Sequence, residues 1–383
     1  MELGKDKKML VLQGGGALGA YQAGAYQALH EAGVRPEWVA GISIGAINSA
    51  IIAGSAPNQR VDNLRAFWEM VSSGPSSIPC ADDPLIRKWF NEYAASLSAL
   101  TGVNGFYVPR VIMPWQYAAD PKASISYYDT SPLIETLKKL VDFDRINAGK
   151  VRLSLGAVDV VSGNFAYFDN HGSEPPDGPL TAHHVAASGA LPPGFPPVEI
   201  DGRYYWDGGL VSNTPLQWVL DKRRTTDDIC VFQVDLFSAS GHLPVDMADV
   251  MAREKEIRFS SRTRYNTDEA RRNELHQKAL RRLLEKLPPE FRDDRDVRLL
   301  RRADDRGAVT VVHLIYQRRA YETHYMDNEF SRLTMESHWA AGYKDVEDTF
   351  RCKSWTGRVI PEDGFVAIDH RRHADKSSKT GEV

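Results

Sequence analysis

The sequence predicts an α/β fold built around a mostly parallel β-sheet, followed by a region rich in helices. Two observations near the N-terminus lead to this prediction. An apolar run, a glycine-rich turn and a helical pattern follow one another at residues 8–32, and the same order recurs at residues 38–53. Repeated strand–turn–helix units are typical of α/β domains with parallel sheets. The third observation is the composition, because 42% hydrophobic and 26% charged residues among 383 exclude a largely disordered chain.

The two N-terminal units can be followed along the chain. Residues 8–12 predict a short buried strand, and residues 17–32 predict a helix, because apolar residues recur there at helical spacing and Gly33 stands where a helix would stop. Residues 38–42 predict the second strand. A tight glycine turn then leads into a helix of small residues at 46–53.

The segment at residues 74–128 differs from its surroundings, because it is rich in Pro, Gly, Ser and aromatic residues. We expect either an inserted lid or a loop that covers the core with ordinary packing aromatics. Long loops in compact domains are commonly functional lids.

The pattern of alternating elements resumes after this segment. Residues 131–140 predict a helix with Ser131 as its N-cap. Residues 151–158 and 164–168 predict a pair of strands joined by a turn, and residues 229–236 predict a further strand.

From about residue 240 the chain becomes more charged and more helical. Residues 251–306 carry 17 Lys and Arg against 12 Asp and Glu, whereas the whole chain has a net charge of −4. An apolar stripe in this stretch predicts an amphipathic helix, which would pack on its own domain or dock on an anionic membrane or a partner. Residues 309–316 predict a late strand, residues 326–351 one or two helices, and residues 371–383 a disordered tail.

The composition also bears on partners and compartment. The mildly acidic net charge argues against nucleic acid as a partner. Cys80, Cys230 and Cys352 lie far apart and form no metal-binding pattern, so a reducing, cytoplasmic compartment is the simplest expectation.

No apolar run is long enough for a transmembrane helix. Lysines before an apolar stretch resemble the start of a signal peptide, but the glycine turn at residues 13–16 interrupts that stretch, and we do not expect secretion.

The first chemical motif is Gly41-Ile42-Ser43-Ile44-Gly45, a GxSxG sequence between a predicted strand and a predicted helix. At such a turn the serine lies on a strained elbow, with its oxygen exposed above the positive end of the helix. The alternative is a tight turn in which Ser43 only caps the helix.

The second motif is the glycine loop Gly14-Gly15-Gly16-Ala17-Leu18-Gly19, also between a strand and a helix. Its backbone amides can converge on one point and cradle an anion. That anion would be the oxyanion of an acyl-transfer reaction or the phosphate of a dinucleotide. A dinucleotide site requires an acidic residue at the end of the next strand, and the strand at 38–42 has none there.

A serine nucleophile needs a base. No histidine lies in a glycine-rich setting that marks it for this role, whereas Asp207-Gly208-Gly209 follows a short strand at residues 204–206. The glycines beside Asp207 would allow another turn to approach closely. The alternative for this third motif is an ordinary hairpin turn.

Together these motifs resemble those of patatin-like phospholipases. The motifs occur in the order GGGxxG, GxSxG and DGG, with residues 187–192 and 195–197 ahead of the last, and the resemblance covers roughly residues 8–235. The resemblance implies a three-layer α/β sandwich with a central, mostly parallel sheet. It further implies a dyad of Ser43 as nucleophile and Asp207 as general base, without a catalytic histidine.

The resemblance also assigns roles within the glycine loop. The oxyanion hole would consist of Gly14, Gly15 and Gly16, in which the amides of Gly15 and Gly16 hold the negative charge and Gly14 shapes the loop. Two positions depart from the family pattern: Leu18 stands where the family usually has Arg or Lys, and Gln13 stands where it usually has an acid. No cofactor and no metal are expected.

The implied organisation is a catalytic domain at residues 8–238, with a lid-like segment at 74–128, a mainly helical region at 239–370 and a tail at 371–383. The implied function is that of a cytoplasmic serine acyl hydrolase of phospholipids or other lipid esters, with peripheral contact to the membrane left open. Aromatic residues such as Trp89 would wall an acyl pocket or touch lipid. Hydrolysis of a short-chain ester, thioester or polyester, nucleotide binding, and a membrane-docking regulator with a vestigial site remain alternatives.

Overall fold

The computed structural model describes residues 5–110, 125–171, 178–223, 226–260, 263–291, 294–302, 307–359 and 364–371. Of the tail expected at 371–383, only Arg371 belongs to these ranges, and part of the segment 74–128 also lies outside them.

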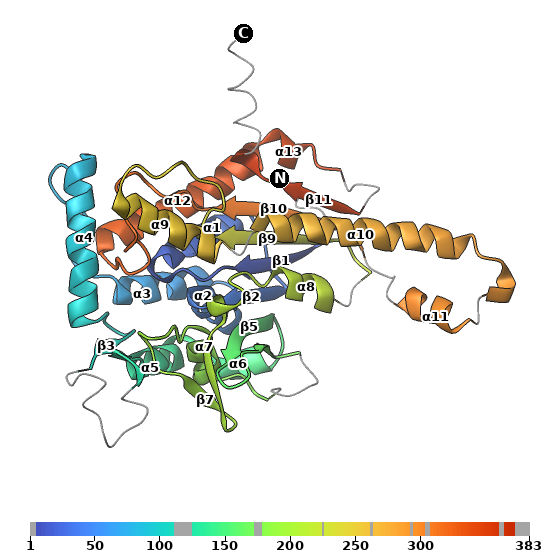
Figure 1. Cartoon of the computed structure of the whole chain (residues 1–383), viewed down its shortest axis with the longest axis horizontal. Coiled ribbons are helices and arrows are strands. Elements are labelled where there is room, and N and C mark those ends of the chain that lie inside the picture. Colours follow the sequence, from blue (N-terminus) through green and yellow to red (C-terminus); the bar gives the residue numbers. More distant parts are fainter. Residues whose placement is uncertain are drawn as a thin grey trace, which may run out of the picture.

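A mixed β-sheet forms the middle layer of the fold (Figure 1). In the described ranges it has nine strands, of which β6 (Phe165–Asp169) pairs with β5 beside the main path. The other strands follow one another across the sheet in the order β11 (Phe365–Ile368), β10 (Val309–Ile315), β9 (Ile229–Asp235), β1 (Lys7–Leu12), β2 (Trp38–Ile42), β5 (Arg152–Asp159), β8 (Arg203–Asp207) and β7 (Val198–Ile200). Neighbours from β11 to β5 are parallel, and β5 pairs antiparallel with β6 and β8, as β8 does with β7. The prediction of a central, mostly parallel sheet is confirmed.

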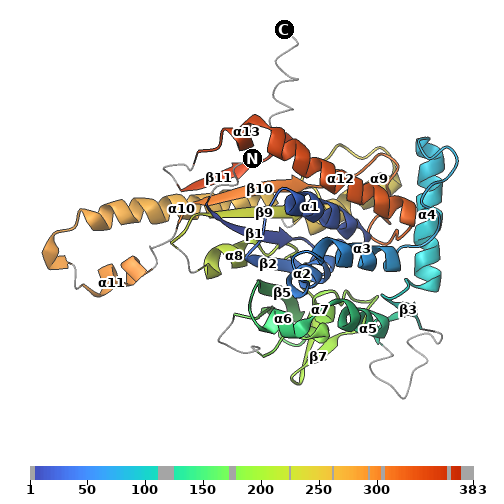
Figure 2. The ribbon, with the colours of Figure 1, turned by 180° about the vertical axis from the view of Figure 1, so that it is seen from behind.

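Helices cover both faces of this sheet and complete three layers (Figures 1 and 2). The larger core lies under α1, α2, α3, α5, α7 and α12, and the smaller core lies under α8 and α10. The helices are α1 (Gly19–Glu31), α2 (Ile44–Gly54), α3 (Arg60–Val71), α4 (Pro84–Thr101), α5 (Ser131–Leu140), α6 (Phe143–Asn147), α7 (Ala182–Ser188), α8 (Leu216–Lys222), α9 (Met247–Phe259), α10 (Thr263–Glu285), α11 (Arg295–Arg302), α12 (Arg332–Arg351) and α13 (Lys353–Thr356).

Burial in β1 accounts for its continuous apolar sequence. Leu10 and Leu12 belong to the larger core, whereas Met9 and Val11 belong to the smaller one. Because helices cover both faces, every position of such a strand favours an apolar residue. The small-residue helix α2 is buried along its whole length, which holds Ser43, at its N-terminus, against the core.

The region after residue 240 is mainly helical, as expected, and it also supplies β10 and β11 to the sheet. Its helix α12 crosses α1 at very short range. A Cβ at Gly24 would lie 1.9 Å from the carbonyl oxygen of Trp339, and a Cβ at Gly342 would lie 1.9 Å from that of Tyr21. Glycine on both helices therefore permits the backbones to touch. The Tyr21 hydroxyl donates to Asp345 over 2.6 Å at the same interface.

The segment expected as a lid or covering loop contains the 18-residue helix α4. Asp83 caps it by accepting from the amides of Leu85 (2.8 Å) and Ile86 (3.2 Å), and Gly102 ends it with a φ of 82°. A two-stranded ribbon of β3 (Val108–Pro109) and β4 (Tyr128–Asp129) follows. The cap predicted at Ser131 is wrong by one position: Thr130 is the N-cap of α5, and the Ser131 amide donates to Asp129.

The two ends of the molecule differ. Helix α4 stands across one end, and the long helix α10 with α11 extends from the opposite end (Figures 1 and 2). In the described part of the chain, no helix combines the length and the apolar character needed to cross a bilayer.

Candidate active site

Ser43 lies at the turn between β2 and α2 with φ of 56° and ψ of −123°. Such a backbone is uncommon for a residue other than glycine and marks stored strain. The flanking glycines are required by close approach: a Cβ at Gly41 would lie 2.2 Å from the Gly45 carbonyl oxygen, and a Cβ at Gly45 would lie 2.4 Å from that of Leu12. The Ser43 amide donates to both the carbonyl oxygen (3.1 Å) and the hydroxyl (3.0 Å) of Ser188. The strained elbow predicted at Ser43 is therefore present.

Asp207 ends β8 and is only 2% exposed. Its carboxylate accepts a hydrogen bond from the Gly209 amide over 2.7 Å and lies beside the Ser43 side chain. Burial raises the pKa of Asp207 to about 6, and interactions with the Ser43 side chain and the Gly209 amide oppose that rise in part. Gly208 packs against β5, where a Cβ would lie 2.7 Å from the Gly156 carbonyl oxygen. The DGG motif thus brings a buried carboxylate to the serine elbow.

The glycine loop contributes two free backbone amides. The Gly14 amide donates to the carbonyl oxygen of Asn213 (3.2 Å), whereas the amides of Gly15 and Gly16 have no partner among the described residues. Gly16 has a φ of 55°, and its position is crowded, because a Cβ there would lie 2.2 Å from the carbonyl oxygen of Asp327. Of the three loop glycines, Gly15 and Gly16 thus have amides without a partner among the described residues, whereas the Gly14 amide is held by Asn213.

These groups share one pocket with a largely apolar wall. Ser43, Asp207 and all three loop glycines line it. The apolar part of the wall consists of Ile44, Ile47, Phe106, Tyr107, Leu191, Phe195, Phe237, Phe259 and Phe330. Trp89, expected as a wall residue or a lipid contact, does not line the pocket and is 77% exposed.

No histidine is among the described residues that line the pocket. His184 lies on α7, which leads to Ser188 beside the elbow, but its Nδ1 is occupied 3.0 Å from the Thr181 hydroxyl at the start of its own helix. Within the described ranges, no group of three or more His, Cys, Asp or Glu side chains is arranged to hold a metal ion.

Gln13, noted as a departure from the family pattern, has a structural role behind the loop. Its side-chain oxygen accepts from the amides of Leu236 (2.7 Å) and Phe237 (2.9 Å), and its nitrogen donates to the Thr214 hydroxyl (3.0 Å). A neutral amide can both accept and donate here, as a carboxylate cannot. The side chain therefore ties the start of the glycine loop to the end of β9.

Asn213 forms a second tie that sequence reasoning did not identify. Its side-chain nitrogen donates to the carbonyl oxygens of Gly14 (3.0 Å) and Phe259 (2.9 Å). One amide group thus joins the glycine loop to the end of α9. The position of Asn213 shortly after the DGG motif was the sequence feature that could have indicated this role.

The C-terminal region reaches the pocket as well. Phe259, Asp327, Asn328 and Phe330 line it, and the Asp327 carbonyl oxygen accepts from the Ala17 amide over 2.8 Å. All site residues expected from the motifs lie before residue 238. No motif marks the later residues, because they reach the site only through the folding of the C-terminal region over it.

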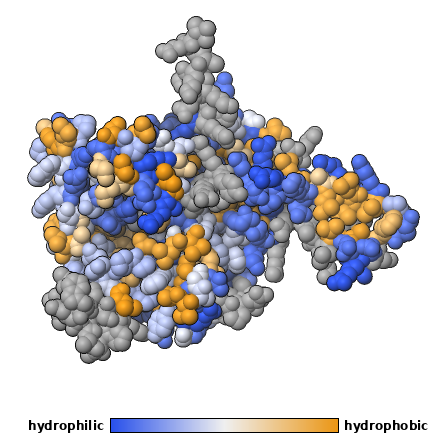
Figure 3. All heavy atoms as spheres, viewed as in Figure 1, coloured by the Kyte–Doolittle hydropathy of each residue, from blue (hydrophilic) through white to orange (hydrophobic). Residues whose placement is uncertain are grey.

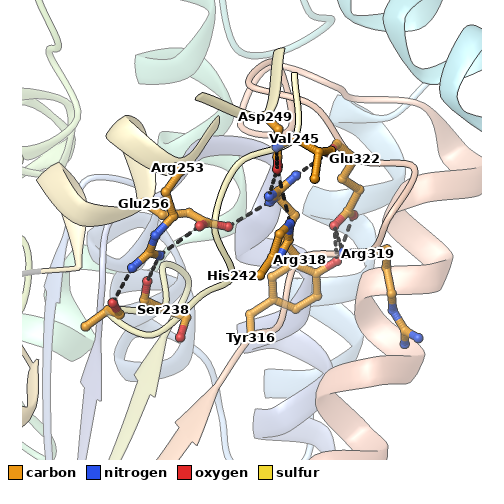
Figure 4. Close-up of polar contacts among 11 residues, drawn as sticks. Ser238, His242, Val245, Asp249, Arg253, Glu256, Tyr316, Arg318, Arg319 and Glu322 are labelled. Atoms are coloured by element: carbon orange, nitrogen blue, oxygen red, sulfur yellow. Dashed lines mark hydrogen bonds and ion pairs between the residues drawn. The ribbon is translucent and has the colours of Figure 1, made fainter. Parts of the chain in front are cut away.

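A network of charges anchors this part of the C-terminal region (Figure 4). The guanidinium group of Arg318 contacts Asp249 and, over 2.8 Å, Glu256, both on α9. Arg253 contacts Glu256 over 2.9 Å. The network fixes α9 against the loop after β10, and α9 carries Phe259 to the pocket.

The chain is similar to known proteins in both its N-terminal and its C-terminal part. A family model described as patatin-like phospholipase matches residues 10–220, and one described as patatin phospholipase matches residues 257–362. A search of curated proteins found no match. VipD from Legionella pneumophila shares 14% identity over 98% of this chain and 75% of its own, with a TM-score of 0.37. A chain of the heterodimeric ExoU–SpcU complex from the type III secretion system of Pseudomonas aeruginosa shares 16% identity over 69% of this chain and 52% of its own, with a TM-score of 0.27.

The family assignment depends on the first of these matches. It contains the glycine loop, the serine elbow and Asp207, and it covers more than half of the 383 residues. The chain belongs to the patatin-like phospholipase family.

Proposed function

We propose that this protein is a serine acyl hydrolase that cleaves phospholipids or related lipid esters through an acyl-enzyme on Ser43. One observation carries the proposal: the strained Ser43 shares a pocket with the buried carboxylate of Asp207, whose pKa its side chain helps to lower, beside two backbone amides without a partner among the described residues. Nucleophile, base and oxyanion donors are the three parts that acyl transfer requires. Membership in a family of lipid hydrolases supports the same reaction class.

The reaction would proceed in two halves. Asp207 accepts the proton as the Ser43 oxygen attacks the ester carbonyl, and the amides of Gly15 and Gly16 hold the resulting oxyanion. Asp207 then returns the proton to the leaving alcohol. In the second half, Asp207 takes a proton from the water that attacks the acyl-enzyme, and it returns this proton to the Ser43 oxygen as the fatty acid leaves. Each oxyanion donor is worth about 3–4 kcal/mol of barrier.

The pocket wall supports an apolar acyl group as the part of the substrate that is bound. Ile47 on α2 and three phenylalanines from separate connecting segments, Phe106, Phe195 and Phe330, line the pocket together with Ser43. An acyl chain would bury its methylene groups against these side chains. The glycine loop has no charged side chain that could contact a head group, because the apolar, buried Leu18 stands where the family usually has Arg or Lys.

Labelling with a fluorophosphonate tests the proposal directly. Wild-type protein is expected to gain one adduct in an intact-mass measurement, because an activated serine attacks the phosphorus. Ser43→Ala should gain none, and Asp207→Asn should react more slowly, since it lacks the base. A folded wild type that stays unlabelled would favour a docking regulator with a vestigial site over an enzyme.

The pH dependence of activity provides a separate prediction. Asp207 must be ionised to act as a base, and burial raises its pKa to about 6. With a soluble ester as substrate, kcat/KM should be constant above this pH and fall about tenfold per unit below it. The Asp207→Asn variant is the control, because its residual activity should lack this acid limb. An acid limb near 3.8, the ordinary value for the group, would contradict the role of Asp207.

A short-chain ester, a thioester or a polyester would use the same dyad and remain second candidates. A panel of esters with increasing acyl chain length distinguishes them. A lipid hydrolase should gain activity once the longer substrates are presented in micelles or bilayers.

A further inference from the structure

Helix α4 carries its apolar side chains on the side that faces solvent. Leu85 and Trp89 are each 77% exposed, Leu100 is 76% exposed, and Tyr93 is 60% exposed. At 100° per residue, these four side chains, with Ile86 and Leu97, lie within a sector of about 120°. An apolar sector of this width normally faces a protein core. In Figure 3, hydrophobic side chains reach the surface at both ends of α4.

The side of α4 that faces the protein is polar. Arg87, Asn91, Ala95 and Ser98 are its buried residues. The Arg87 guanidinium donates to the Thr334 hydroxyl on α12 (3.0 Å), which in turn donates to Asn91 (3.4 Å). The helix is thus held by hydrogen bonds, and hydrophobic burial does not account for its apolar residues. Their outward placement calls for an apolar environment outside the protein.

The exposed stripe leads to the active site. From Gly102 at its end, the chain runs directly into Phe106 and Tyr107, both of which line the pocket. Tyr128 connects the same two places, because its hydroxyl donates to the Ala99 carbonyl oxygen (2.9 Å) and its ring packs 4.8 Å from that of Tyr107. Packed aromatic side chains therefore connect the C-terminal end of α4 to the pocket wall.

The stripe carries no charge. Every exposed position of α4 is uncharged, and its charged residues are the buried Arg87 and the half-buried Lys88 and Glu92. Trp and Tyr in the middle with Leu at both ends is a composition typical of helices that lie at a membrane surface. The described charges beside the stripe are of both signs, and the exposed Asp82 and Asp83 directly precede it, so they give no preference for anionic lipids.

We infer that α4 docks the enzyme on the surface of a lipid bilayer, with its apolar stripe in the interface and the active-site pocket beside it. This inference rests on the proposed lipid hydrolysis. The size of the stripe argues against a second copy of the chain as the occupant. Eighteen helical residues make a strip of about 27 by 10 Å, well below the roughly 800 Å² per partner that a stable protein interface buries. A bilayer accommodates such a narrow strip, because lipids adapt to its shape.

Co-sedimentation with phosphatidylcholine vesicles tests the inference. Wild type should bind equally at low and high salt, because no charge takes part. The double variant Trp89→Ser, Tyr93→Ser should bind at least about tenfold more weakly, because both replaced side chains leave water when the wild type docks. Leu283→Ser is the matched control: this α10 residue is 62% exposed, lies at the opposite end of the molecule and should leave binding unchanged.

Activity measurements separate this inference from the proposed function. The double variant should hydrolyse a soluble monomeric ester at the wild-type rate and lose activity toward phosphatidylcholine in vesicles. If wild type binds vesicles but hydrolyses neither substrate, docking stands and the enzymatic proposal fails. If the variant binds and acts like wild type, the inference is overturned. If high salt or Leu283→Ser abolishes binding, the inference is overturned in favour of docking through α10. If the protein is a dimer that the double variant dissociates, the stripe is the contact with a second copy of the chain.

Discussion

Replacing Ser43 by Ala is expected to abolish ester hydrolysis and leave the fold intact. The Ser43 hydroxyl is the oxygen that attacks the ester in the proposed mechanism, and removal of a catalytic serine typically lowers kcat by about 10⁶-fold. The substitution keeps Cβ, so packing at the elbow should not change. Turnover of a soluble ester and the thermal unfolding midpoint measure the two effects.

Ser43→Gly is the matched variant for this experiment. It removes the same hydroxyl but also relieves the strain of a non-glycine residue at φ 56°. We therefore expect it to be equally inactive and about 1 kcal/mol more stable to unfolding than Ser43→Ala. Equal stability of the two variants would show that the elbow stores no strain. Hydrolysis by either variant would contradict the assignment of Ser43 as the nucleophile.

Replacing Gly16 by Ala is expected to lower kcat by about 10²- to 10³-fold, the typical cost of losing one oxyanion donor. A Cβ at this position would lie 2.2 Å from the Asp327 carbonyl oxygen, on a backbone with φ of 55°. The opposing atom belongs to the backbone and cannot rotate away. The loop must therefore move, and the amides of Gly15 and Gly16 move with it.

Gly163→Ala controls for the backbone strain of that substitution. Gly163 has a φ of 70°, but a Cβ there would have no neighbour within 4 Å. This variant should lose some stability, as Ala does at positive φ, and keep full activity toward a soluble ester. If Gly16→Ala retains wild-type kcat, the glycine loop does not provide the oxyanion hole.

The sequence predicted the local geometry of the site well. The positive φ at Ser43, the turn glycines around it and the free amides of the glycine loop all follow from short runs of adjacent residues. Such turns depend on steric limits of a few neighbouring residues, which are visible in the sequence. The order of strands and helices was predictable for a similar reason, since hydrophobic periodicity reports on local structure.

Other features depended on contacts between distant parts of the chain. No sequence pattern indicated that Phe259 and Asp327 complete the pocket, because they reach it through the packing of α12 on α1 and through the charge network around Arg318. It also did not predict which side of α4 faces water. Periodicity identifies an apolar face, and we ordinarily assign that face to the core.

The sequence by itself therefore determined the fold class, the serine elbow and the glycine loop. Only the tertiary structure decided that Asp207 meets Ser43, that the C-terminal region closes the pocket, and that α4 presents its apolar face outward. The physical reason is the range of the interactions. Backbone sterics and periodicity act over a few residues, whereas burial and long-range hydrogen bonds, such as that from Arg87 to Thr334, exist only once the chain has folded.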